Sequence, residues 1–167
     1  MKRFFAVVLA LLLALNVGVA FASQASSLSF KDFYFFYVMG STILGGEYPA
    51  ELGEPASSRD GDYAILEYKL EEEAITMKFW VNKNTEIYKI ELFLASESID
   101  ENIEVFTWTI CGILHGCSAV YGMEEAASFL SAMNFGAKNT FKGTEMAGLS
   151  IFGWEMDLDG ITFTAYP

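Results

Sequence analysis

The chain has 167 residues and carries 22 acidic against 10 basic side chains, which gives a formal net charge of −12 at pH 7. An acidic protein of this kind repels phosphate backbones, so the composition argues against a nucleic acid as partner. The length suits one domain, or two small modules that share a sheet, and a chain of this size can bury roughly 68–70% of its unfolded surface.

The first 22 residues follow the pattern of a secretory signal peptide. Lys2 and Arg3 precede an apolar run from Phe4 to Leu15, and Ala20-Phe21-Ala22 forms a small-x-small cleavage site. An uncleaved membrane anchor is the alternative, but polar and glycine residues interrupt the apolar run and favour cleavage. We therefore expect an exported protein, secreted or periplasmic, with no membrane span after signal cleavage. Removing the two leader charges from −12 leaves −14 on the remainder.

The segment after the leader is aromatic and then becomes rich in Gly, Pro and Ser. Aromatic residues are enriched in strands, which favours a strand over Phe33–Val38; a buried amphipathic helix is the alternative. We also expect a short helix near Tyr48–Leu52, ended by Gly53 and Pro55, and an exposed loop after it.

Three antiparallel strands are predicted over Tyr63–Leu70, Ala74–Asn82 and Glu86–Leu94, because their side chains alternate with a period of two. Pairing Leu70 with Ile75 and Asn82 with Ile87 places the apolar side chains of all three strands on one face. These are Ala64, Leu66, Tyr68, Leu70, Ile75, Met77, Phe79, Val81, Tyr88, Ile90, Leu92 and Leu94. A slip of one residue would exchange the faces, so the pattern specifies the register.

The opposite face of this meander is predicted to be polar. It carries the cross-strand row Glu67–Lys78–Glu91, in which each neighbouring pair has opposite charges. Such pairs contribute about 0.2–1 kcal/mol each, and they indicate a face in contact with water.

Trp80 is unusual on this polar face. It lies in a second row with Ile65 and Lys89, and Phe93 shares the face. Trp is among the residue types most enriched at binding hot spots, so Trp80, Phe93, Ile65, Lys78 and Lys89 form a candidate binding surface, an aromatic and basic concavity. If another element covers the face, Trp80 belongs to the core instead.

The second half of the chain begins with a polar connector, Ser96–Asn102, which marks the boundary between two predicted modules, 23–98 and 99–167. Glu104–Ile110 alternates well enough for a strand. Met123–Asn134 has apolar residues at helical spacing and is predicted to be an amphipathic helix. Asp159-Gly160 is a two-residue turn signal, predicted to pair Leu158 with Ile161.

Cys111 and Cys117 are the only cysteines, and an exported chain favours a disulfide between them. This bond would staple the loop that carries His115, the only histidine, which we expect to be displayed at the loop tip as a contact residue. A redox pair usually has Cys-x-x-Cys spacing, and a metal site built on these three residues lacks a fourth local ligand. The sequence therefore predicts neither a metal nor another cofactor.

A hydrolase that uses His115 with a nearby carboxylate is the alternative function. It would need a nucleophile, yet no Gly-x-Ser-x-Gly motif is present and a disulfide would leave no free thiol. The acidic pairs Asp60/Asp62 and Asp157/Asp159 adjoin glycines and are typical of turns, since the full calcium-loop pattern is missing. No catalytic residue is predicted.

Both halves can be written as aromatic strand, glycine-containing turn, helix, polar loop and antiparallel strands. Leu52-Gly53-Glu54-Pro55 follows one expected helix, and Gly122-Met123-Glu124-Glu125-Ala126-Ala127 opens another. In this order of elements the chain resembles the β-lactamase-inhibitor-protein-like proteins and the related outer-membrane assembly lipoproteins, which are built from tandem α+β modules. It departs from them in its closely spaced cysteines and in having no lipidation Cys, so no binding residue is carried over.

Together these patterns predict an α+β protein with an antiparallel β-sheet, helices packed on one face, and two tandem modules as a further option. The expected function is a secreted, non-enzymatic protein-binding or inhibitory protein, whose partner is another extracytoplasmic protein. It would use the open sheet face around Trp80 and the stapled loop Cys111–Cys117. A structural component of the cell envelope is a further alternative.

Overall fold

The computed structural model describes residues 27–44, 51–71 and 73–167. The expected signal peptide, 1–22, lies outside these ranges, as does most of the short helix expected near Tyr48–Leu52. Among the described helices, none is long and apolar enough to cross a membrane.

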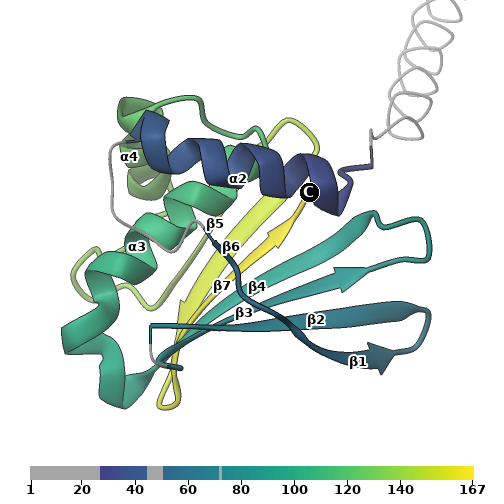
Figure 1. Ribbon diagram of the computed structural model, residues 1–167. Coiled ribbons are helices and arrows are strands. Elements are labelled where there is room, and N and C mark those ends of the chain that lie inside the picture. Colours follow the sequence, from purple (N-terminus) through teal and green to yellow (C-terminus); the bar gives the residue numbers. More distant parts are fainter. Residues whose placement is uncertain (1–26, 45–50, 72) are drawn as a thin grey trace, which may run out of the picture.

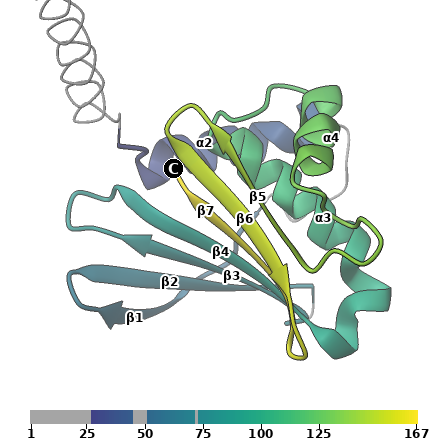
Figure 2. The same ribbon diagram turned by 180° about the vertical axis from the view of Figure 1, so that it is seen from behind.

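The described chain forms a seven-stranded antiparallel sheet and three α-helices (Figure 1), which confirms the predicted α+β class. In order across the sheet the strands are β1 (Ala56–Asp60), β2 (Tyr63–Leu70), β3 (Ile75–Val81), β4 (Ile87–Ala95), β7 (Gly160–Tyr166), β6 (Ser150–Met156) and β5 (Lys142–Ala147). The helices are α2 (Phe30–Leu44), α3 (Ile99–Gly116) and α4 (Met123–Ala132). Figure 2 shows the opposite side, where none of the described helices lies in front of β1 to β4.

The strand predicted over Phe33–Val38 is wrong, because this segment is part of α2. The helix buries one side of every turn, and its buried residues are Phe33, Tyr37, Gly40 and Leu44. This spacing matches the 3.6-residue period of a helix, so burial of one helical face outweighs the strand propensity of the aromatic residues. The amphipathic alternative is the correct one.

The start of α2 is fixed by a side-chain cap. The Ser29 hydroxyl oxygen accepts a hydrogen bond from the backbone N–H of Asp32 at 3.1 Å, and the same hydroxyl donates to the Asp32 carboxylate at 2.6 Å. Such a cap satisfies a backbone donor that the first turn leaves free, and the acidic side chain suits the positive end of the helix dipole. The spacing Ser29-x-x-Asp32 is therefore a helix-start signal in the sequence.

The strand predicted over Glu104–Ile110 is also wrong, because α3 runs from Ile99 to Gly116 and includes part of the predicted polar connector. Two β-branched residues fit into the helix by using their hydroxyls. Thr107 donates to the carbonyl of Ile103 and Thr109 to the carbonyl of Val105, both at 2.7 Å. These bonds satisfy the hydroxyls within the helix itself.

The predicted register of the meander is confirmed over β2 and β3 and over most of β4. Leu70 pairs with Ile75, and Trp80 pairs with Lys89, as the alternation requires. The prediction is wrong for Tyr88, because the register shifts after Trp80 and Val81 pairs with Ile87. Tyr88 is the extra residue of this β-bulge, and it is 53% exposed instead of buried.

The C-terminal hairpin has a longer turn than the two-residue turn predicted at Asp159-Gly160. Met156 pairs with Ile161, so four residues form the turn, and Leu158 is 96% exposed instead of pairing with Ile161. The Asp157 carboxylate accepts hydrogen bonds from the backbone N–H groups of Asp159 and Gly160, at 2.9 and 3.2 Å. This side-chain cap stabilises the wider turn.

The two halves of the chain contribute to one sheet and one helical layer. β4 pairs with β7 from Ile90 to Ala95, and α2 packs closely against α3. The helices are tightly packed at Gly116, where an added Cβ atom would lie 2.5 Å from the ring of Phe33. The helix predicted over Met123–Asn134 is confirmed as α4, whereas the division at 98/99 into modules stays a prediction.

Candidate functional site

The structure places four of the predicted binding residues together on the face of the sheet opposite the helices. Ile65, Trp80 and Lys89 lie side by side on β2, β3 and β4, and Lys78 lies in the adjoining row. Phe93 shares the face but lies four residues along β4 from Lys89, about 13 Å away at the rise of a strand. It is therefore outside the group.

Trp80 is half-buried between Ile65 on β2 and Lys89 on β4, and no described helix covers this face of the sheet (Figure 2). Its indole N–H donates to the Asp60 carboxylate at 3.3 Å, and the Lys89 ammonium lies 4.3 Å from the ring centroid. A cation over an indole face is attracted by the negative π surface. These contacts hold the indole in one orientation while its remaining surface faces solvent.

The lysines on this face are already paired, so the predicted basic character is absent. The ammonium of Lys78 lies 3.4 Å from the Glu67 carboxylate, and that of Lys89 lies 2.6 Å from the Glu91 carboxylate. A hydrogen bond from Lys69, with the positive charge of Lys78 as a further cause, lowers the pKa of Glu67 below its usual value. This carboxylate therefore stays ionised and continues to neutralise the lysines.

A hollow of about 390 Å³ adjoins Trp80 at the end of the strands. It is lined by Asp60, Gly61, Asp62, Tyr63, Trp80, Tyr88 and Lys89. The Tyr63 and Tyr88 rings stack at 4.8 Å, and the Tyr88 ring meets the edge of Tyr166 at 6.0 Å. We call these three tyrosines, Trp80 and the stem of Lys89 the aromatic face.

The sequence prediction missed the tyrosines of the aromatic face. Tyr63 and Tyr166 lie at positions that alternate with core residues, so the period of two could have identified them. Tyr88 is different, because only the β-bulge turns it outward. The alternation pattern assigns it to the core and contains no signal for the bulge.

The prediction of a disulfide is wrong. Cys111 and Cys117 are both free cysteines. Cys111 lies within α3 and Cys117 at its C-cap, so six residues of helical rise, about 9 Å in all, separate them along the axis. A disulfide requires Cα atoms within about 7 Å. Burial raises the pKa of Cys111 to about 11 and raises that of Cys117 as well, so neither thiol is activated.

The prediction that His115 is a displayed contact residue is wrong. It lies in the last turn of α3, is 5% exposed, and stacks on Phe36 with ring centroids 6.5 Å apart. Neither ring nitrogen has a hydrogen-bond partner among the described residues, and burial lowers the pKa of the ring. Among the described residues, therefore, none provides the bonded carboxylate that the hydrolase alternative needs.

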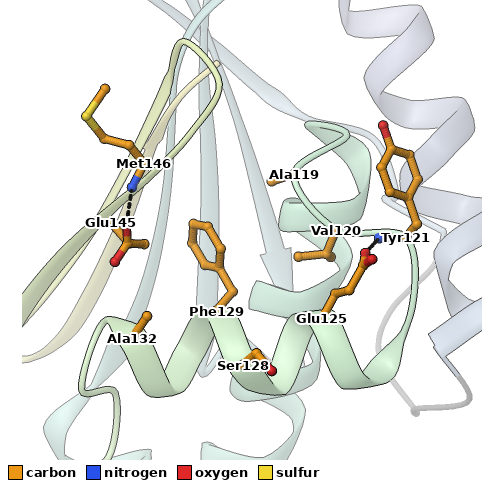
Figure 3. A pocket seen from close by; sticks show the side chains of 9 residues that line it. All are labelled: Ala119, Val120, Tyr121, Glu125, Ser128, Phe129, Ala132, Glu145 and Met146. Carbon is orange, nitrogen blue, oxygen red and sulfur yellow. Dashed lines mark hydrogen bonds between the residues drawn. The ribbon is translucent and has the colours of Figure 1, made fainter.

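A second hollow, of about 540 Å³, lies between α4 and β5 (Figure 3). Two carboxylates of its lining, Glu125 and Glu145, lie on either side of Phe129. Glu125 accepts a hydrogen bond from the backbone N–H of Tyr121 at 2.7 Å, and Glu145 accepts one from the backbone N–H of Met146 at 3.0 Å. Neither carboxylate faces a histidine or a cysteine in the lining. Within the described ranges, no three His, Cys, Asp or Glu side chains are grouped closely enough to hold a metal ion.

Comparisons of the chain with protein-family models, curated proteins and solved structures found no match. The resemblance to tandem α+β modules depends on the order of elements alone, and it stays a prediction. The geometry of the aromatic face is therefore the main evidence for function.

Proposed function

We propose that this chain is an exported, non-enzymatic protein-binding protein, and that the aromatic face is its binding surface. The observation that carries this proposal is Trp80, half-buried beside Tyr63 and the exposed ring of Tyr88 on a sheet face that no described helix covers. Trp and Tyr are enriched at protein interfaces and at their hot spots. Such residues at this density indicate a surface that is covered by a partner.

Exposed apolar side chains continue this surface toward the other edge of the sheet. Tyr166 on β7 pairs with Ile151 on β6, which pairs in turn with Met146 on β5, and all three side chains are exposed. A contiguous row of this kind is uncommon on a monomer without a binding role. It gives a partner contacts across β3, β4, β7, β6 and β5.

The charges around the aromatic face favour a partner with basic groups. Asp60 and Asp62 lie at the hollow beside Trp80, whereas Lys78 and Lys89 are paired with glutamates. The chain beyond the leader has a net charge of −14, which attracts a basic protein over a distance. Association should therefore weaken as salt is added.

Cross-linking in solution tests whether a partner meets this face. A photoreactive benzoylphenylalanine replaces Tyr88 in one preparation and Ile43, which is exposed on α2, in the control. In the extracytoplasmic fraction of the native source, we expect a discrete cross-linked protein from position 88 and none from position 43. Equal cross-linked products from both positions would show non-specific association with the whole protein surface and would contradict the proposal.

Titration with the partner identified in this way measures the contribution of Trp80. We expect Trp80→Ala to weaken binding by about 2 kcal/mol or more, which is roughly 30-fold in Kd. Leu158→Ser is the matched control, because it removes an exposed apolar side chain outside the aromatic face. The proposal is wrong if Trp80→Ala folds normally and binds like the wild type.

A further inference from the structure

A third hollow lies on the helical side of the molecule, between α3, α4 and the loop that follows α4. Its volume is about 720 Å³. Ile103 contributes from α3, Leu130 from α4, Phe135 and Phe141 from the loop, and Ile161 from β7. We call it the helix groove. It lies on the other side of the sheet from the aromatic face.

The walls of the helix groove are held by fixed contacts. The Trp154 indole N–H donates to the backbone carbonyl of Met133 at 3.0 Å, and the Trp154 ring meets Phe135 edge to face at 5.1 Å. Gly143 allows the loop to lie close, since a Cβ atom there would be 1.8 Å from the same Met133 carbonyl. All of these contacts are made within the chain, so the fold itself holds this wall of the groove in place.

The loop is also tied to its neighbours through the backbone. The N–H of Phe135 donates to the carbonyl of Leu130 at 2.9 Å, and the N–H of Met156 donates to the carbonyl of Phe141 at 2.7 Å. Both ends of the loop are therefore anchored, one on α4 and one on β6. Binding in the groove does not have to order this wall first.

The chemistry of the lining defines the ligand. None of the described side chains that line the groove is charged, although the whole chain has a net charge of −12. Its polar side-chain groups are hydroxyls, one amide and the Trp154 indole N–H, which donates to Met133, and the Thr107 hydroxyl already donates to Ile103 within α3. A charged ligand would lose its hydration here without gaining an opposite charge, which is costly. An apolar ligand gains from burial.

We propose that the helix groove binds an uncharged, largely apolar small molecule. Its volume lies within the range of about 300–1,000 Å³ that is typical of small-molecule sites, and such sites have mainly apolar walls with few polar groups. The absence of lining charge in an acidic protein argues for a neutral ligand. This site is independent of the proposed protein-binding function.

Two fluorescent probes with the same aromatic skeleton test the proposal on the full chain. N-phenyl-1-naphthylamine is neutral, and 8-anilinonaphthalene-1-sulfonate carries a sulfonate. We expect saturable binding of the neutral probe to the native protein, and at least tenfold weaker binding of the anionic one. No saturable binding of the neutral probe, or equal binding of both, would overturn the proposal.

Matched substitutions on α4 locate the probe. Ala127 and Ala132 are both exposed, but Ala127 lines the helix groove and Ala132 lines the hollow in Figure 3. We expect Ala127→Trp to weaken binding of the neutral probe at least tenfold and Ala132→Trp to leave it unchanged. Ser131→Trp, also exposed at the groove, repeats the test if Ala127→Trp does not fold.

Three outcomes of the substitution experiment would overturn the proposal. Equal effects of the substitutions at positions 127 and 132, or none at either, would place the probe elsewhere and overturn the proposal. Trp80→Ala is the control for the other face, and a loss of probe binding in this variant alone would also overturn it. Failure of protein capture by the aromatic face would leave the helix groove unaffected.

Discussion

His115 illustrates how burial changes the role of a single side chain. Its ring nitrogens lack partners among the described residues, and burial lowers its pKa. The folded state therefore favours the neutral ring, while the unfolded chain takes up a proton below its ordinary value of about 6.5. This difference in proton uptake couples the stability of the fold to pH.

We predict that the protein loses stability as the pH falls from 7.5 to 5.5, by at most about 1.4 kcal/mol per pH unit from this residue. The loss of stability begins near the pKa of the histidine in the unfolded chain. It continues until the pH has fallen below the lower pKa of the histidine in the folded protein. His115→Phe should flatten the profile, because His115 is the only histidine in the chain. Thermal unfolding across this range measures the effect, and parallel profiles for both proteins would contradict it.

At the residue scale, alternation in the sequence places most side chains on the correct face. It locates Trp80 opposite the core and pairs it with Lys89, as the structure has it. It cannot locate Tyr88, because the β-bulge that turns this ring outward depends on how the backbone accommodates one extra residue. A side-chain pattern with a period of two does not indicate where a β-bulge inserts an extra residue.

At the scale of elements, the sequence analysis favoured a strand where α2 lies, with a helix as the alternative, and predicted a strand where α3 lies. Both are rich in aromatic and β-branched residues, which favour strands locally. Their buried residues nevertheless recur with a helical period, such as Phe106, Ile110 and Ile113 in α3. Burial of one face against the sheet decides the outcome, because tertiary packing contributes more than propensity.

The helical state of residues 111–116 predicts the redox behaviour of the cysteines. We expect intact mass spectrometry of the protein from an oxidising buffer to show two free thiols, and reductant to leave the thermal midpoint unchanged. The reason is that a bond between Cys111 and Cys117 would have to unwind the last turns of α3. A mass lower by about two hydrogens in the folded protein would contradict the helical assignment.

At the scale of the whole molecule, one sheet connects strands from both ends of the chain. Leu92 on β4 is fully buried and pairs with Met77 on β3 and with Phe163 on β7. A side chain in this position supports the core on both sides of the predicted module boundary. The fold class follows from the sequence, whereas the joining of β4 to β7 depends on long-range pairing that local patterns do not specify.

We predict that Leu92→Ala costs about 2–5 kcal/mol and that β3 and β6 unfold together in one transition. Hydrogen exchange should show equal loss of protection in both strands, and Leu158→Ala, at an exposed turn, should change neither. Loss of protection in β3 alone would show two independent modules.

The positions of the two ends of the described chain determine where a tag or a solid support can be attached. Ser27 and Pro167 line the same hollow as Tyr63, Tyr88 and Tyr166, and the Ser27 hydroxyl donates to Glu86 at 2.6 Å. An affinity tag or a solid support attached at either position would crowd these rings and compete with an incoming ligand. The turn at Leu158 lies at the far end of β6 and β7 (Figure 1), so immobilisation there would leave them accessible.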